Sequence, residues 1–398
     1  MLRTRSQSYL RLNILKRSVI SLDTFIIGVY LILSPIDYAL GEIITSFSFI
    51  NLIAIALILV RICKKDFWNS KPKDFLLIAV FYFYNVINIL LFSDILMDAI
   101  FLLFGLCFFF VNYKEANETE IKFFRLCILL SIIVTIATCF FSFRFERSNS
   151  RFYLNFSRYV DPNYFTCGFI VLTAYLMHRI NQKKTIILDI LLLVCLFTII
   201  LASGSRGGLL ANLGVVFVYL LFSKLKNIFL PVLLFVVIFY IALSFFKEYI
   251  PKWILERFEI SAMLKDQGSG RLTIWYNYWN ILKNGSLLKF IFGYGKKNQL
   301  TTYQYYFGIR KNPHNMFLGV FFNSGIIGLI LLLFVLGYFS LISLKNKNLF
   351  SLSLIVGLVL SGLTLDMNVT RTFWIVLTII FMVNFRMKKL KDEKNATI

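Results

Sequence analysis

Four short segments of this sequence place a cation or a histidine next to residues that favour the start of a helix. A helix N-terminus presents free N–H groups and the positive end of the helix dipole, so it attracts anions. Arginine adds planar, bidentate hydrogen bonding to phosphate. The pattern predicts a phosphate or diphosphate site, provided that the four helix starts lie together. Its residues are Arg158, Arg206, His314 and Arg371.

His314 is the candidate for proton transfer within this set. It lies in Asn312-Pro313-His314-Asn315, where a helix start would keep the imidazole neutral and able to act as a general base. Three acids are alternative bases: Asp161, Glu259 and Asp366. A second interpretation of each motif is structural. His314 can cap or pack a helix, and Ser203–Gly208 can form a tight helical hairpin whose small residues only allow packing.

The elements that would position these residues are membrane helices. The 398 residues are 59% hydrophobic and include 44 Phe, well above the apolar content of soluble domains. Runs of about 20 apolar residues are long enough to span a bilayer as helices. The sequence therefore predicts an all-α, polytopic integral membrane protein with about 12 transmembrane helices. The expected spans are 18–35, 43–60, 74–92, 95–113, 123–143, 161–178, 185–203, 207–223, 227–246, 316–342, 349–366 and 371–386.

The distribution of charge predicts the orientation. With both termini cytoplasmic, every predicted inside segment is basic, and together these segments hold 25 of the 42 Lys and Arg residues. The net charge of +22 is thereby explained without nucleic acid. We expect helices one to nine in residues 1–246 and a long extracytoplasmic loop at 247–313. Helices ten to twelve and a cytoplasmic tail would follow in 314–398.

Several of these motifs, in this order, resemble the O-antigen ligase and polysaccharide polymerase family of bacterial membrane proteins. The resemblance extends over about residues 155–345. It rests on Arg158 with Asp161-Pro162-Asn163, Ser203–Gly208, Gly270-Arg271-Leu272 with Trp275, Phe292-Gly293-Tyr294-Gly295, Pro313-His314-Asn315 with Leu318, and Gly325-Ile326-Ile327-Gly328.

The resemblance implies a metal-independent, inverting glycosyltransferase without a cofactor, at the outer face of the cytoplasmic membrane. It implies that His314 is the base and Arg206 a catalytic cation. The diphosphate ligands would be Arg158, Arg206, Arg271, Arg310 and Arg371. The substrates would be oligosaccharides linked to undecaprenyl diphosphate. Membrane lipids, a chain-length regulator and a flippase of the same pathway would be the other partners.

Three functions remain open at this point. A polymerase would join lipid-linked repeat units in lipopolysaccharide or capsule biosynthesis, and this is the function we favour. A ligase would pass the finished glycan to lipid A-core or another acceptor. A flippase or transporter of lipid-linked sugars would also need many spans, but transporters usually carry polar or broken helices near the membrane midplane.

Overall fold

The computed structural model describes residues 20–40, 55, 58–59, 75–92, 99–109, 111, 115–144, 153–154, 162–183, 185–246, 256, 259, 261 and 270–387. Nearly all of these residues are helical. The exception with regular structure is a two-residue antiparallel pair, β1 (Phe143–Arg144) with β2 (Tyr153–Leu154). The all-α class expected from the sequence is confirmed.

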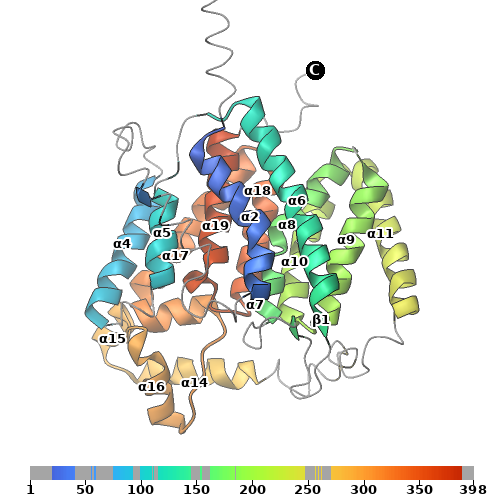
Figure 1. The fold of residues 1–398 in the computed structure, drawn as a ribbon. Helices are drawn as coiled ribbons and strands as arrows, with labels where there is room; N and C mark the ends of the chain where they lie inside the picture. The colour runs from blue at the N-terminus through green and yellow to red at the C-terminus, as the bar shows by residue number, and fades with distance from the viewer. Residues whose placement is uncertain are drawn as a thin grey trace, which may run out of the picture.

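The long helices run side by side as a bundle, and a group of short helices lies across one end of it (Figure 1). The bundle contains α2 (Leu22–Leu40), α4 (Phe75–Phe92), α5 (Ala99–Phe109), α6 (Glu118–Ser142), α8 (Ile170–Asn181), α9 (Ile186–Ala202), α10 (Arg206–Phe222), α11 (Leu225–Phe246), α17 (Met316–Lys345), α18 (Leu349–Gly362) and α19 (Arg371–Phe381). The short helices at the end are α7 (Pro162–Cys167), α14 (Arg271–Asn284), α15 (Leu287–Phe292) and α16 (Lys297–Phe307). Two irregular segments flank α19: the 3₁₀-helix η3 (Met367–Val369) and the π-helix η4 (Met382–Arg386).

Two of the described helices are long and apolar enough to cross a membrane, within Glu118–Phe141 and Met316–Lys345. Six shorter apolar helices accompany them: Leu22–Ile36, Leu76–Phe92, Ile186–Ala202, Arg206–Phe222, Ile228–Ile241 and Leu349–Gly362. The described helices therefore do not confirm the prediction of twelve transmembrane helices. Most of the expected span 43–60 lies outside the described residues.

Two of the expected spans are interrupted, contrary to the sequence-based prediction of continuous helices. The span 161–178 divides into α7 and α8 at Gly168 and Phe169. Helix α17 is kinked at Gly325, whose φ is 67°. A Cβ on Gly325 would lie 2.0 Å from the Ile291 carbonyl oxygen, because the end of α15 packs directly into the kink. Backbone bonds from Tyr294 N to Phe322 O (2.8 Å) and from Gly295 N to Asn323 O (3.0 Å) hold the two segments together.

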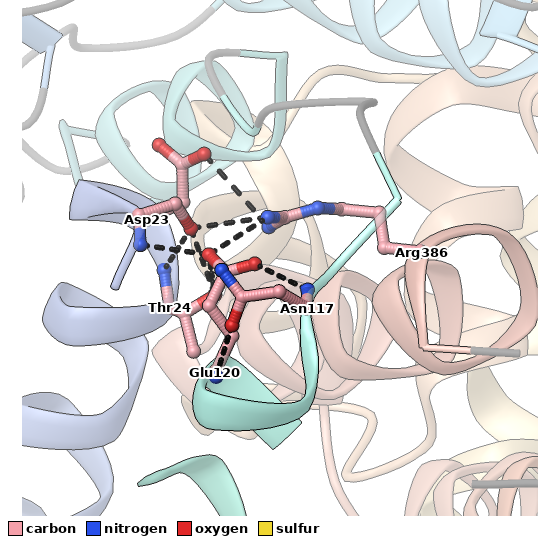
Figure 2. A network of polar contacts seen from close by, with 6 residues as sticks. Asp23, Thr24, Asn117, Glu120 and Arg386 are labelled. Atoms are coloured by element: carbon pink, nitrogen blue, oxygen red, sulfur yellow. Dashed lines mark hydrogen bonds and ion pairs between the residues drawn. The ribbon is translucent and has the colours of Figure 1, made fainter. Parts of the chain in front are cut away.

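A buried polar cluster closes the opposite end of the bundle (Figure 2). Arg386 of η4 is 1% exposed, and its guanidinium lies 3.9 Å from Asp23 Oδ2 of α2 and 3.4 Å from Glu120 Oε1 of α6. Glu120 Oε1 also accepts from the backbone N–H of Ser21 at 2.7 Å. We call Asp23, Glu120 and Arg386 the Arg386 clasp. It joins the first, middle and last parts of the described chain.

Candidate functional site

The turn before α10 is built by small residues that fit against α7. Ser205 caps α10, since its Oγ accepts from Gly208 N at 3.0 Å. The same hydroxyl donates to Asn163 Oδ1 and accepts from Thr166 Oγ1, both at 2.8 Å. A Cβ on Gly208 would lie 2.0 Å from Thr166 Oγ1. The glycine therefore permits close packing, and the turn places Arg206 at the first position of α10.

The segment between α18 and α19, residues 363–370, links α10 to α17; we call it the α18–α19 connector. Its Thr364 side chain packs directly against Gly207, since a Cβ on Gly207 would lie only 2.5 Å from Thr364 Oγ1. On the other side, Asp366 Oδ1 accepts from the backbone N–H of Asn315 at 3.3 Å. The connector thus brings the N-termini of α10 and α17 to one place.

Helix α14 reaches the same place from the short-helix group. The indole N–H of Trp275 donates to Pro313 O at 2.8 Å, and the Tyr278 hydroxyl donates to Lys311 O at 2.7 Å. These bonds hold the chain that leads into α17. Arg271, the first residue of α14, lies close enough for its charge to act on Asp366.

His314 lies between the residues that these bonds fix. It is half-buried, and its φ of 46° is in the left-handed region that a non-glycine residue rarely adopts. Such a conformation costs on the order of 1 kcal/mol or more and persists only where its surroundings impose it. The Trp275–Pro313 bond and the Asn315–Asp366 bond supply that constraint on either side. The backbone of His314 is therefore held in place at the start of α17.

Asp366 has an unusual acidity for an aspartate. Burial raises its pKa to about 7. The N–H of Asn315, the charge of Lys296, the N–H of His314 and the charge of Arg271 act in the opposite direction. A carboxyl group with a pKa near neutral pH can gain or lose a proton under working conditions.

Three of the helices at this end begin with an arginine. Arg206, Arg271 and Arg371 are the first residues of α10, α14 and α19, and none of these helices has an acidic residue in its first turn. A positive side chain at the positive end of a helix dipole opposes the usual stabilising pattern. A bound anion would reverse that effect at each helix. The arrangement is suited to a phosphate-containing ligand.

The structure brings together some of the sequence-predicted residues and not others. Arg206, Arg271 and His314 belong to the segments that meet at the connector, and Arg371 directly follows it. Arg310 is exposed, and its Nε donates to Gln304 Oε1 at 2.7 Å, so its described bond is to α16 and not to the connector. Arg158 and Asp161 lie outside the described residues. Glu259 is described and is exposed.

Sequence reasoning gave too little weight to two residues. Asp366 was one of three alternative acids, yet the fold places it against His314 and Asn315. Lys296 directly follows the Gly293-Tyr294-Gly295 motif, and its charge acts on Asp366. No signal in the sequence connects Asp366 with the His314 segment, or Lys296 with Asp366, because both interactions depend on tertiary packing. Among the described residues, no group of three or more His, Cys, Asp or Glu side chains is arranged to hold a metal ion.

The region that contains most of this site can be compared with known proteins. Residues 191–333 match the family model described as O-antigen ligase. The resemblance expected from the sequence is thereby confirmed for this part of the chain, about a third of its length. The matched O-antigen ligase region contains Arg206, Arg271, Arg310 and His314, whereas Asp366 and Arg371 follow it. No curated protein matches the chain.

Proposed function

We propose that this protein is a membrane glycosyltransferase that joins oligosaccharide repeat units carried on undecaprenyl diphosphate, as a surface-polysaccharide polymerase. The observation that carries the proposal is the meeting of Arg206, Arg271 and His314 around the α18–α19 connector, within or beside the region that matches the O-antigen ligase family. We propose that the site faces the outer side of the cytoplasmic membrane, with both chain termini cytoplasmic.

The outer surface of the bundle supports placement in a membrane. Large apolar side chains on α9, α10, α11 and α17 point outward and are exposed, including Ile187 (72%), Phe217 (56%), Phe229 (63%), Phe245 (75%) and Phe334 (61%). Soluble monomers rarely expose large apolar side chains together in this way. A lipid environment covers them at no cost, because lipid tails are as apolar as the side chains.

The arrangement accounts for the chemistry of glycosyl transfer from a lipid diphosphate. The acceptor hydroxyl attacks the anomeric carbon, and the bond from that carbon to the diphosphate oxygen breaks. Negative charge grows on the departing diphosphate, where Arg206, Arg271 and the N-termini of α10 and α14 would stabilise it. His314 would accept the proton of the attacking hydroxyl. Asp366 would position the His314 segment through the Asn315 N–H.

The scheme requires no divalent ion, because arginines and helix N-termini carry the charge stabilisation. EDTA should therefore leave transfer unchanged. Complete inhibition by EDTA that Mg²⁺ or Mn²⁺ reverses would contradict this part of the proposal.

A ligase is the second candidate, and the description of the matched family favours it. Both reactions use the same donor chemistry and differ in the acceptor. The continuity of the helices does not argue against a transporter, because the breaks at Gly168 and Gly325 resemble the discontinuous helices of that class. The arginines at helix starts, rather than the continuity of the helices, are what favour an enzyme.

Deletion of the gene in its host, followed by gel separation of the surface polysaccharide, tests these functions. The deletion strain is complemented with wild type, Arg206→Ala, His314→Ala or the control Arg310→Ala, each checked for expression. Loss of the long-chain ladder with single repeats still attached supports a polymerase. Loss of all attached glycan, with long chains retained on the carrier, indicates a ligase. An unchanged ladder and unchanged attachment contradict both.

A further inference from the structure

A basic pocket lies at the end of the bundle opposite the candidate site. It has a volume of about 260 Å³ and lies between α6 and α8, near the Arg386 clasp, since Glu120 and Lys122 are in the same part of α6. Its lining residues are Lys122, Arg125, Leu126, Leu129, Tyr175, His178, Arg179 and Gln182. Three of them are cations and none is an acid. The two halves come from segments separated by about 50 residues of sequence.

The three cations differ in how far their charge is already neutralised. Arg179 Nε lies 2.9 Å from Asp189 Oδ1, and Arg179 also bonds to Thr185 Oγ1. Its guanidinium lies 5.8 Å from the centre of the Tyr175 ring. By contrast, no carboxylate of the described chain forms an ion pair with Lys122 or Arg125. Two positive charges thus face the pocket without a counterion among the described residues within ion-pair distance.

The pocket also offers an apolar side. Leu126 and Leu129 lie on α6 beside the charges, and Leu126 is 51% exposed. Helix α6 is one of the two described helices that are long and apolar enough to span a bilayer. A ligand that fills this pocket should therefore combine an anionic group with an apolar part. Basic pockets between membrane helices bind anionic lipid head groups for this reason.

We propose that this pocket binds the phosphate head group of an anionic phospholipid, with Lys122 and Arg125 as its main ligands and Arg179 as a third. The acyl chains would lie along Leu126 and Leu129. Gln182 and His178, which are hydrogen-bonded to each other through Nε2 atoms at 2.9 Å, form the polar side of the pocket. The proposal rests on the membrane placement proposed above and not on the glycosyl-transfer chemistry.

Native mass spectrometry of the full chain in detergent tests the proposal, with phosphatidylglycerol as the probe and phosphatidylcholine as the zwitterionic comparison. Wild type should retain phosphatidylglycerol and not phosphatidylcholine. Lys122→Gln/Arg125→Gln should weaken phosphatidylglycerol binding by about tenfold or more, since each basic residue near a lipid phosphate contributes roughly 1 kcal/mol. The matched control Lys224→Gln/Lys345→Gln removes the same charge from exposed positions outside the pocket and should bind like wild type.

Three results would overturn the proposal. They are equal retention of both lipids by wild type, equal weakening in the control variant, and unchanged binding in Lys122→Gln/Arg125→Gln. Adding sn-glycerol 1-phosphate as a competitor of phosphatidylglycerol shows whether the head group alone is enough for binding to the pocket. If it binds while phosphatidylglycerol does not, the pocket serves a soluble phosphate, and the lipid assignment fails. Competition on wild type does not depend on the folding of any variant. Because binding and not turnover is measured, loss of the glycosyltransferase proposal would leave this result unaffected.

Discussion

Asp366→Asn separates a positioning role for this residue from a role as the base. The Asp366 carboxylate accepts a hydrogen bond from the backbone N–H of Asn315, with a nitrogen–oxygen distance of 3.3 Å. The side-chain amide oxygen of the Asp366→Asn variant can accept the same hydrogen bond. A neutral hydrogen bond of this kind contributes about 1 kcal/mol, so its weakening should reduce transfer by no more than about tenfold. Removing a general base costs about 10²–10⁴-fold. His314→Ala should show that larger loss.

The same substitution has an effect on stability with a defined sign. Burial raises the pKa of Asp366 from 3.8 to about 7, so the folded protein favours the protonated form. The stability associated with that proton is present below pH 4 and is lost as the pH rises through about 7. The loss is at most about 1.4 kcal/mol per pH unit. Asp366→Asn should remove this part of the pH dependence.

Two measurements on purified protein in detergent decide the matter. One is transfer from a lipid-linked oligosaccharide, followed by gel, and the other is thermal unfolding between pH 4 and pH 8. A loss of more than 10²-fold in Asp366→Asn, with His314→Ala still active, would refute the assignment of the base to His314. Identical pH profiles of unfolding for wild type and Asp366→Asn would refute the account of the Asp366 environment.

Three other perturbations have expected outcomes. Arg271→Ala should lower the rate of glycosyl transfer by about 10²–10³-fold in the same gel assay. Arg310→Ala changes an exposed residue bonded to Gln304 and should stay within a few-fold of wild type, so equal losses would contradict the placement of Arg271 in the site. Gly208→Ala should lower the unfolding temperature, because overpacking against Thr166 typically costs about 1–3 kcal/mol. Gly337→Ala has open space around the added methyl group and should leave the unfolding temperature unchanged. An unchanged unfolding temperature in Gly208→Ala would show that α7 can move. Arg386→Met should destabilise the protein by about 3–5 kcal/mol by leaving two buried acids without their cation, as measured by denaturant unfolding, with the exposed Arg310→Met as control.

Local sequence signals located the helices well where small polar residues mark their ends. The expected spans 185–203 and 207–223 correspond closely to α9 and α10, because Ser203–Gly208 supplies both the turn and the Ser205 cap. In each case, the residues that define the boundary are neighbours in sequence.

Structural features that depend on packing between distant segments could not be predicted from the sequence. The kink at Gly325 exists because the α15 end packs into α17, more than 30 residues away in sequence. The span 161–178 is divided where α7 bonds through Asn163 and Thr166 to Ser205, about 40 residues away in sequence. The pairing of Asp366 with the His314 segment likewise depends on tertiary packing. The candidate arginines could be found from their types, but their meeting point could not.

The Arg386 clasp has a consequence for how the chain is made. Asp23 and Glu120 enter the bundle early during synthesis, more than 260 residues before the guanidinium that lies between them. Until Arg386 is synthesised, the carboxyl groups of Asp23 and Glu120 have to remain hydrated. The early helices can therefore insert but cannot complete their packing before the last turn is delivered. Assembly of this bundle should therefore finish only after η4 has been synthesised, in a late step that joins α2 and α6 to η4.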